Sequence, residues 1–107
     1  MAWTVLFLDE RVEAEMEEQP ADIRARFDRM RDIICEHGPA LLPPKYAKHI
    51  EDKLWELRMK GKDGIARAFY VTASGQRLVI VRVFTKKSQK TPTREIKLAR
   101  QRAEEGT

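Results

Sequence analysis

Three arginines and three lysines in the second half of the chain have the chemistry to recognise a phosphodiester. Arginine presents a planar set of donors that matches phosphate oxygens, whereas lysine supplies a mobile positive charge. The lysines lie in the segment VRVFTKKSQKTP, which follows a run of apolar residues. If the six side chains converge, they form a cationic surface suited to a nucleic acid. They are Arg58, Arg67, Arg82, Lys86, Lys87 and Lys90.

Two aromatic residues, Phe84 and Tyr70, occur close to these cations in the sequence. RNA bases can stack on aromatic rings or on the plane of an arginine, so the combination favours an RNA strand as the partner. The alternative is that the same cations pair with an acidic segment of a partner protein. Residue spacing alone leaves both interpretations open.

Other site chemistries have little support in the sequence. Cys35 is the single cysteine, which excludes an intramolecular disulfide and a cysteine-based zinc site. It follows two isoleucines, a setting typical of a buried thiol. His37 and His49 are the two imidazoles, and a histidine placed like His49, ahead of a strand, is more often structural than catalytic. No metal and no cofactor is therefore predicted.

The first half of the chain predicts a strand and two helices. Residues 3–8 are aromatic and β-branched, which is typical of a strand, and Asp9 is a good N-cap for a following helix. A second helix is predicted from Pro20 in its first turn, with apolar residues at Ile23, Phe27, Met30 and Ile34. Gly38 and Pro39 end it, and the prolines up to residue 44 predict an irregular connector.

The second half predicts three strands and a helix. The strands are residues 54–58, 67–71 and 78–84, and the last is the most apolar, so it is predicted to be central in the sheet. Thr91 and Pro92 predict the start of a C-terminal helix with Ile96, Ala99 and Ala103 on its apolar side. The chain is thus predicted to form one α+β domain, residues 1–107, in the order β-α-α-β-β-β-α.

Strand alternation predicts which of the cations share a face. If the valines at positions 79, 81 and 83 point into the core, then Arg82, Phe84 and Lys86 lie on the opposite face. Arg58 and Arg67 join them if the neighbouring strands have the matching register. The sequence does not give that register.

The charge is divided unevenly along the chain. Residues 1–23 carry one basic and seven acidic side chains, while residues 45–102 carry sixteen basic and five acidic ones, within a net charge of +4. Such a division favours one basic face that meets a polyanion. No apolar run approaches the roughly 20 residues of a membrane span, and the first residues lack the pattern of a signal peptide. A cytoplasmic protein that does not contact membranes is expected.

Three segments together resemble a known family. They are LWELR at 54–58, RAFYV at 67–71 and GQRLVIVRVFTKKSQKTP at 75–92, followed by a short basic helix. This combination resembles the RelE/ParE superfamily of bacterial toxins, and within it the HigB-like, phage-derived Gp49-like branch. The resemblance covers nearly the whole chain and is strongest over residues 53–103. It implies a RelE-like α+β fold: a small, twisted, mainly antiparallel sheet with an N-terminal helical hairpin on one face and a C-terminal helix.

The resemblance also implies a function. Members of the family act as the toxin of a type II toxin-antitoxin pair, enter the ribosomal A site and cut messenger RNA without a metal. The ribose 2′-hydroxyl attacks the adjacent phosphate, which leaves a cyclic phosphate and a 5′-hydroxyl. The implied partners are the ribosome, messenger RNA and a cognate antitoxin encoded by an adjacent gene, often with a helix-turn-helix domain.

Carried over by position, the resemblance assigns roles to the cations. Arginines can stabilise the charge that develops on the phosphate, and a lysine can act as the base if nearby cations lower its pKa. The implied catalytic residues are Arg58, Arg67, Arg82, Lys86 and Lys87. The implied RNA-binding residues are Lys90, Phe84, Tyr70 and Arg94.

The individual acid and base are not assigned. Some relatives have a tyrosine or histidine after the last strand, whereas this chain has Phe84, which can stack on a base but cannot transfer a proton. Glu56 lies two residues before Arg58 on the same strand face, so it could either orient that arginine or act as a base.

Two further functions are compatible with the same family. In the ParE-like alternative the fold inhibits DNA gyrase and cuts nothing. In the other, the chain is a non-catalytic nucleic-acid-binding or antitoxin-bound module. The basic KKSQKTP segment and the arginines favour RNA over the gyrase alternative, whereas the non-catalytic alternative stays open.

Overall fold

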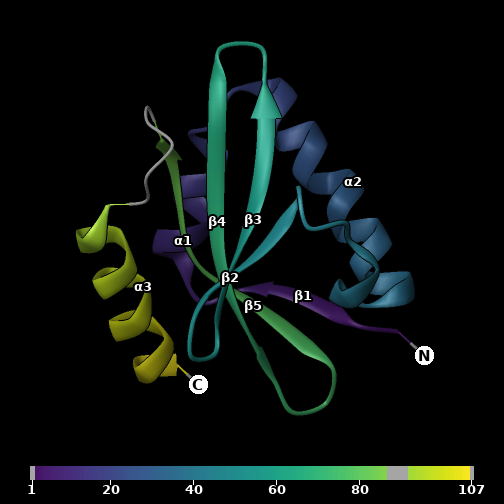
Figure 1. Cartoon of the computed structure of the whole chain (residues 1–107), viewed down its shortest axis with the longest axis vertical. Coiled ribbons are helices and arrows are strands. Elements are labelled where there is room, and N and C mark those ends of the chain that lie inside the picture. The colour runs from purple at the N-terminus through teal and green to yellow at the C-terminus, as the bar shows by residue number, and fades with distance from the viewer. Residues whose placement is uncertain (1, 87–91, 107) are drawn as a thin grey trace.

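The computed structural model describes residues 2–86 and 92–106, which form a five-stranded sheet with helices on both faces (Figure 1). The strands are β1 (Thr4–Phe7), β2 (Ala47–Glu51), β3 (Leu54–Gly61), β4 (Gly64–Ala73) and β5 (Arg77–Lys86). Their order across the sheet is β1-β5-β4-β3-β2. The β1–β5 pair is parallel and the other three pairs are antiparallel, so the mainly antiparallel α+β fold is confirmed.

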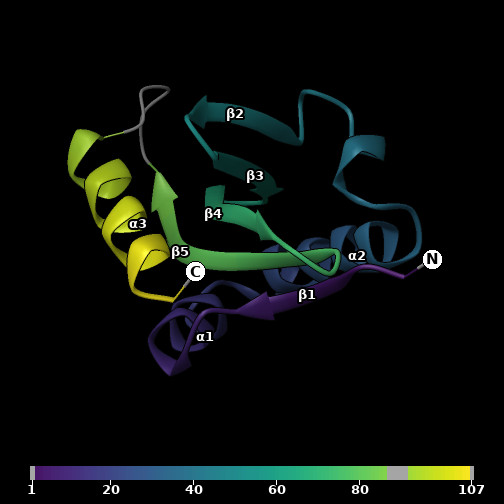
Figure 2. The same ribbon diagram turned by 90° about the horizontal axis from the view of Figure 1, so that it is seen from below.

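Two helices pack on one face of the sheet and the third packs on the other (Figure 2). The first two are α1 (Glu10–Glu17) and α2 (Ala21–His37), and the third is α3 (Thr93–Gly106). A short 3-10 helix, Pro39–Leu41, follows α2. In the part of the chain that the structure describes, no helix is long and apolar enough to cross a membrane.

Local sequence signals explain where α1 and α2 begin and end. The Asp9 side chain accepts hydrogen bonds from the backbone N–H groups of Arg11 and Val12, as expected of an N-cap. Pro20 is the N-cap residue of α2 instead of lying within its first turn. Gly38 ends α2 with a φ of 85°, and a Cβ there would lie 2.8 Å from the indole nitrogen of Trp3. Glycine alone satisfies both conditions.

The core between α1, α2 and the sheet holds the apolar residues that the helix periodicity predicted. Ile23, Phe27, Met30 and Ile34 are all buried on α2, and Val12 and Met16 are buried on α1. A second, smaller core lies under α3, where Ala99 is fully buried and Ile96 and Ala103 are partly buried. The predicted apolar sides of α2 and α3 are confirmed.

The strand predictions differ from the structure in two respects. Strand β2 was not predicted, because its sequence AKHIE is polar and it lies at the edge of the sheet, where one side needs no strand partner. The predicted central position of residues 78–84 is wrong, because β4 occupies the middle and β5 lies between β4 and β1.

A β-bulge in β5 changes which side chains share a face. Phe69 pairs with Arg82 and Tyr70 pairs with Ile80, so Val81 is an extra residue in β5. Val81 therefore packs in the core under α3, while Val83 packs in the core under α1 and α2. The prediction that the three valines share one face is wrong, because the bulge interrupts the alternation.

Candidate nucleic-acid interface

The strand register brings Arg58, Arg67 and Phe84 into one row across β3, β4 and β5. Arg58 pairs with Arg67, and Arg67 pairs with Phe84. Directly opposed residues of antiparallel strands project from the same face, which here is the face that carries α3. The expected convergence of Arg58 and Arg67 is confirmed, whereas their catalytic roles stay predictions.

A buried carboxylate lies between the two arginines. The Oε1 atom of Glu56 lies 3.0 Å from Nε of Arg58 and 3.5 Å from Nε of Arg67. The side chain of Glu56 is 0% exposed, compared with 31% for Arg58 and 5% for Arg67. A carboxylate at that depth does not reach a substrate hydroxyl. Of the two roles considered for Glu56, the structure favours orientation of the arginines.

The electrostatics of this group leave an excess of positive charge. Burial lowers the pKa of Arg67, an effect that the Arg58 charge reinforces and the Glu56 charge opposes. The carboxylate of Glu56 carries one negative charge beside two guanidinium groups. Of these, Arg58 is the more exposed to solvent. The row can therefore hold one further negative charge, such as a phosphate.

Phe84 is part of this row and is largely shielded from solvent. It is 7% exposed, and its ring packs edge-on against Phe69 at a centroid distance of 5.2 Å. The Arg82 guanidinium lies 5.7 Å from the Phe84 ring centroid. Most of the stacking area that the sequence offered on Phe84 is thus already covered by protein.

Arg82 lies in the next row but is compensated by two carboxylates. Its Nε lies 2.8 Å from Oε1 of Glu95 on α3, and its Nη1 lies 2.8 Å from Oε2 of Glu15 on α1. The hydrogen bond to Glu95 chiefly raises the pKa of Arg82. Arg82 therefore ties β5 to both helices and has less charge available for an anion than Arg58.

Tyr70 and His49 lie on the other face of the sheet. Tyr70 is 3% exposed and packs among the residues under α1 and α2, where burial raises its pKa to about 12. His49 pairs with Trp55 on that face, and its Nε2 lies 2.7 Å from the backbone oxygen of Asp52. The structure thus separates both residues from the Arg58 and Arg67 row.

Two of the remaining predicted residues, Lys86 and Arg94, lie in described elements. Lys86 is the last residue of β5, with its backbone paired to Ile65. Arg94 is exposed in the first turn of α3. Lys87 and Lys90, and the predicted helix cap Thr91, lie outside the described residues. Strand β5 therefore leads directly from the arginine row into the KKSQKTP segment.

Two lysines that the sequence analysis missed extend this surface. Lys60 follows Arg58 by two residues on β3, and Lys48 pairs with Glu56 from β2, so both project from the α3 face. Both are exposed. Strand alternation could have identified Lys60, whereas Lys48 required the unpredicted strand β2. We refer to Lys48, Arg58, Lys60 and Arg67 as the cationic surface.

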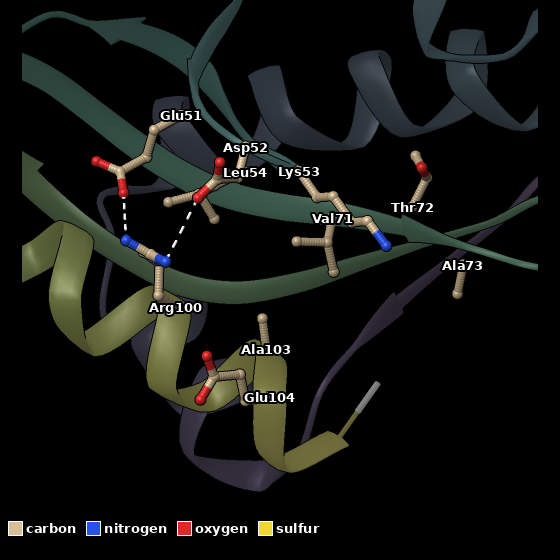
Figure 3. A pocket seen from close by; sticks show the side chains of 10 residues that line it. All are labelled: Glu51, Asp52, Lys53, Leu54, Val71, Thr72, Ala73, Arg100, Ala103 and Glu104. Carbon is tan, nitrogen blue, oxygen red and sulfur yellow. Dashed lines mark hydrogen bonds and ion pairs between the residues drawn. The ribbon is translucent and has the colours of Figure 1, made fainter.

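A pocket of about 560 Å³ lies farther along the same face, between α3 and the β2–β3 turn (Figure 3). Arg100 of α3 spans it, with contacts of 2.6 Å to Glu51 and 3.4 Å to Asp52 (Figure 3). Glu104 adds a third carboxylate, against the two cations Lys53 and Arg100. This balance does not favour a polyanion, so the pocket marks the boundary of the cationic surface.

Metal-binding side chains are not grouped in the described structure. Among residues 2–86 and 92–106, the histidine, cysteine, aspartate and glutamate side chains form no group of three that could hold a metal ion.

The arrangement of the sheet with helices on both faces is shared with a solved structure. A chain of the crystal structure of the archaeal RelE–RelB complex from Pyrococcus horikoshii OT3 is similar, with a TM-score of 0.59 and 22% sequence identity. The match covers 81% of this chain and 98% of that chain. Among curated proteins, none matches this chain.

The sequence identifies the family within that fold. Residues 14–104 match the model of the family described as phage derived protein Gp49-like (DUF891). The chain therefore belongs to the Gp49-like family, and its fold is similar to that of a chain in the archaeal RelE–RelB complex.

Proposed function

We propose that this chain is the toxin of a type II toxin-antitoxin pair and that it cuts messenger RNA on the ribosome as a metal-independent endoribonuclease. One observation carries the proposal. Arg58 and Arg67 are held side by side around the buried Glu56, at the part of the sheet from which β5 leads into the KKSQKTP segment. This arrangement suits a phosphate whose negative charge increases during the reaction.

In the proposed reaction, the 2′-oxygen of a ribose attacks the phosphorus of the next phosphodiester. A bond forms between the 2′-oxygen and phosphorus, and the bond from phosphorus to the 5′-oxygen breaks. The 2′-hydroxyl proton passes to a base and a proton is delivered to the leaving 5′-oxygen. Arg58 and Arg67 donate to the non-bridging oxygens, and the lysines Lys86 and Lys87 are the proposed proton-transfer groups.

The ribosome is the proposed site of action because the chain has limited means of its own to organise a flexible RNA strand. Phe84 is largely covered, and Tyr70 and His49 lie on the opposite face. Ribosomal RNA can hold the message with the 2′-oxygen in line with the leaving oxygen, which lowers the entropic part of the barrier. Equal cleavage rates on free RNA in EDTA and on translating ribosomes would contradict this part of the proposal.

An antitoxin partner is part of the same proposal. The similar chain comes from a crystal structure of an archaeal RelE–RelB complex, which supports a protein partner for this chain. Two oppositely charged surfaces are available for it. The cationic surface is one, and the other is formed by exposed glutamates of and next to α1, namely Glu10, Glu13, Glu17 and Glu18. Hydrogen exchange of the complex distinguishes them, and protection remote from both surfaces would contradict the proposal.

The direct test replaces Arg58, the more exposed of the two arginines, by lysine, which keeps the charge but removes the planar donors. Cleavage of a defined message by translating ribosomes is mapped by primer extension. Loss of one aligned donor at a developing charge costs roughly 10²–10³ in rate, so a fall of that size is expected. The matched control is Arg29→Lys, at an exposed position on the outer side of α2, which should cut like the original chain.

Three results bear on the alternatives. Equal cleavage by Arg58→Lys and the original chain would show that the row of Arg58 and Arg67 is not the catalytic surface. Collapse of DNA supercoiling before translation would favour the gyrase inhibitor instead. If inducing the folded chain without a partner arrests neither process, the chain is a binding module.

A further inference from the structure

On the edge of β5 that faces away from β4, the hydrogen-bonding partner changes halfway along the strand. Up to Ile80 the partner is β1, and the last bond of that ladder runs from the Leu8 N–H to the Ile80 oxygen at 2.9 Å. The chain then leaves β1 and enters α1, capped by Asp9. The backbone groups of β5 beyond Ile80 therefore need other partners, because buried peptide groups are costly when unpaired.

Two side chains replace the missing strand. Glu15 of α1 accepts from the Val83 N–H at 3.0 Å, and Arg102 of α3 donates to the Val81 oxygen at 3.0 Å. They also bind each other, with Arg102 Nη1 3.0 Å from Oε1 and 2.9 Å from Oε2 of Glu15. In a parallel ladder a neighbouring strand would supply such a donor and acceptor, and here one side chain from each flanking helix does so.

One of the two bonded backbone groups belongs to the bulge residue, and the other lies two residues beyond it. Val81 is the extra residue of β5, and Val83 is the first residue beyond it that returns to the core under α1 and α2. A one-residue slip of a strand moves every later side chain to the other face. Without the bulge, Phe84 would leave the face that carries Arg67, and the following residues of β5 would be displaced in the same way.

The burial of this pair shows that it is part of the interior. Arg102 is 7% exposed, and its Nε has no hydrogen-bond partner among the described residues. Burial of a guanidinium carries a large desolvation free energy unless the group is paired. The contacts of Arg102 with Glu15 and with the Val81 oxygen offset this free energy. Arg100, on the same helix, has a side chain that is 50% exposed and makes its ion pairs at the surface.

We propose that Glu15 and Arg102 are positioning residues for the site: they fix the bulge in β5 and so place Phe84 on the face that carries Arg58 and Arg67. The inference rests on the proposed function for its effect on cleavage. The claim that Glu15 and Arg102 fix the bulge does not depend on that function. Neither side chain belongs to the cationic surface, so each acts through β5.

The test compares Arg102→Met with two variants of the same helix. Arg102→Lys keeps a donor for the Val81 oxygen, and Arg100→Met removes an exposed guanidinium that does not contact β5. Two measurements report the position of β5 by NMR: exchange of the Val83 amide and the ring contact between Phe69 and Phe84. The third is the cleavage rate on translating ribosomes.

The proposal predicts a joint change in all three measurements. In Arg102→Met the Val83 amide should exchange at least tenfold faster, the Phe69 to Phe84 contact should weaken, and cleavage should slow at least tenfold. Arg102→Lys should recover part of each loss, and Arg100→Met should match the original chain. Amides of Leu57 and Ala68, in the β3–β4 ladder, should stay protected and thereby show that the fold is intact.

Separate outcomes overturn separate claims. An unchanged Val83 amide and ring contact in Arg102→Met would refute the positioning role, even if the original chain cuts nothing. A displaced β5 with full cleavage would refute its importance for the site. If Arg102→Met does not fold, Glu15→Gln decides by the Phe69 to Phe84 ring contact alone, because it weakens the pair with Arg102. Its cleavage rate is not used, since Glu15 also pairs with Arg82. An original chain that does not cut would refute the proposed function and leave the NMR result standing.

Discussion

Arg58 and Arg67 lie opposite each other on β3 and β4, and both guanidinium groups contact the same oxygen of the fully buried Glu56. Two cations are therefore held close together by one anion that solvent does not reach. Removal of the anion leaves two positive charges in a partly buried site, where their repulsion is weakly screened.

Glu56→Gln is accordingly expected to destabilise the fold as well as the site. Breaking a buried ion pair from one side costs about 3–5 kcal/mol, and a loss of that size in the free energy of unfolding is expected from urea denaturation. The control is Glu51→Gln, because Glu51 is 39% exposed in its pair with Arg100 and should cost less than about 1 kcal/mol. Equal small losses in both variants would show that Glu56 does not hold the arginines.

Lys48 and Lys60 should contribute to RNA affinity without acting in the chemistry. Phosphate contacts release counterions, so affinity falls with salt, and each lost contact reduces the slope of log affinity against log salt by roughly 0.7–0.9. Lys48→Gln and Lys60→Gln are expected to show this reduction in ribosome binding, with Arg29→Gln unchanged. Slopes equal to that of the original chain would place the bound RNA away from β2 and β3.

Asp22 should make the loop between β3 and β4 sensitive to acid. Its Oδ2 accepts from the Lys62 N–H at 2.6 Å, and this bond chiefly lowers the pKa of Asp22 below its ordinary value of 3.8. A lowered folded-state pKa means that the contribution to stability is present above pH 3.8 and disappears as the pH falls through the folded-state value. Thermal unfolding of the original chain and of Asp22→Ala should therefore converge in acid. A constant difference at all pH values would contradict this role, and Asp32→Ala is the control on the same helix.

Tyr70 should titrate as a buried phenol. Burial raises its pKa from 10.0 to about 12, so the folded state disfavours the phenolate. The stability that this provides is complete below pH 10.0 and is lost as the pH rises through about 12. Tyrosinate absorbance should show a component near 12 that Tyr70→Phe lacks. A normal titration of every tyrosine in the folded chain would place Tyr70 at the surface.

The sequence predicted the helices better than the sheet. The spacing of Ile23, Phe27 and Ile34 is a local property of α2, and local periodicity suffices to identify the face that packs on the sheet. The bulge at Val81 depends on groups supplied by α1 and α3, far away in the chain, so no pattern within β5 reveals it. Strand β2 was missed for a related reason, since its place is determined by pairing with β3 and not by its own composition.

The same distinction applies to the site. Arg58 and Arg67 were recognised from residue type and strand alternation, and the structure brings them together. Lys48 could not be recognised without the β2–β3 register. Tyr70 was assigned to the RNA face from its type alone, and the register places it on the opposite face.

The parallel pairing of β1 with β5 has a consequence for biosynthesis. Thr4 lies beside Arg77, so the first strand to leave the ribosome waits for the last strand before it gains its partner. Strands β2 to β5 are neighbours in both sequence and space, and they can pair successively as they emerge. We therefore expect the nascent chain to carry β1 unpaired until β5 is complete, whereas Arg58 and Arg67 are already brought together when β4 pairs with β3.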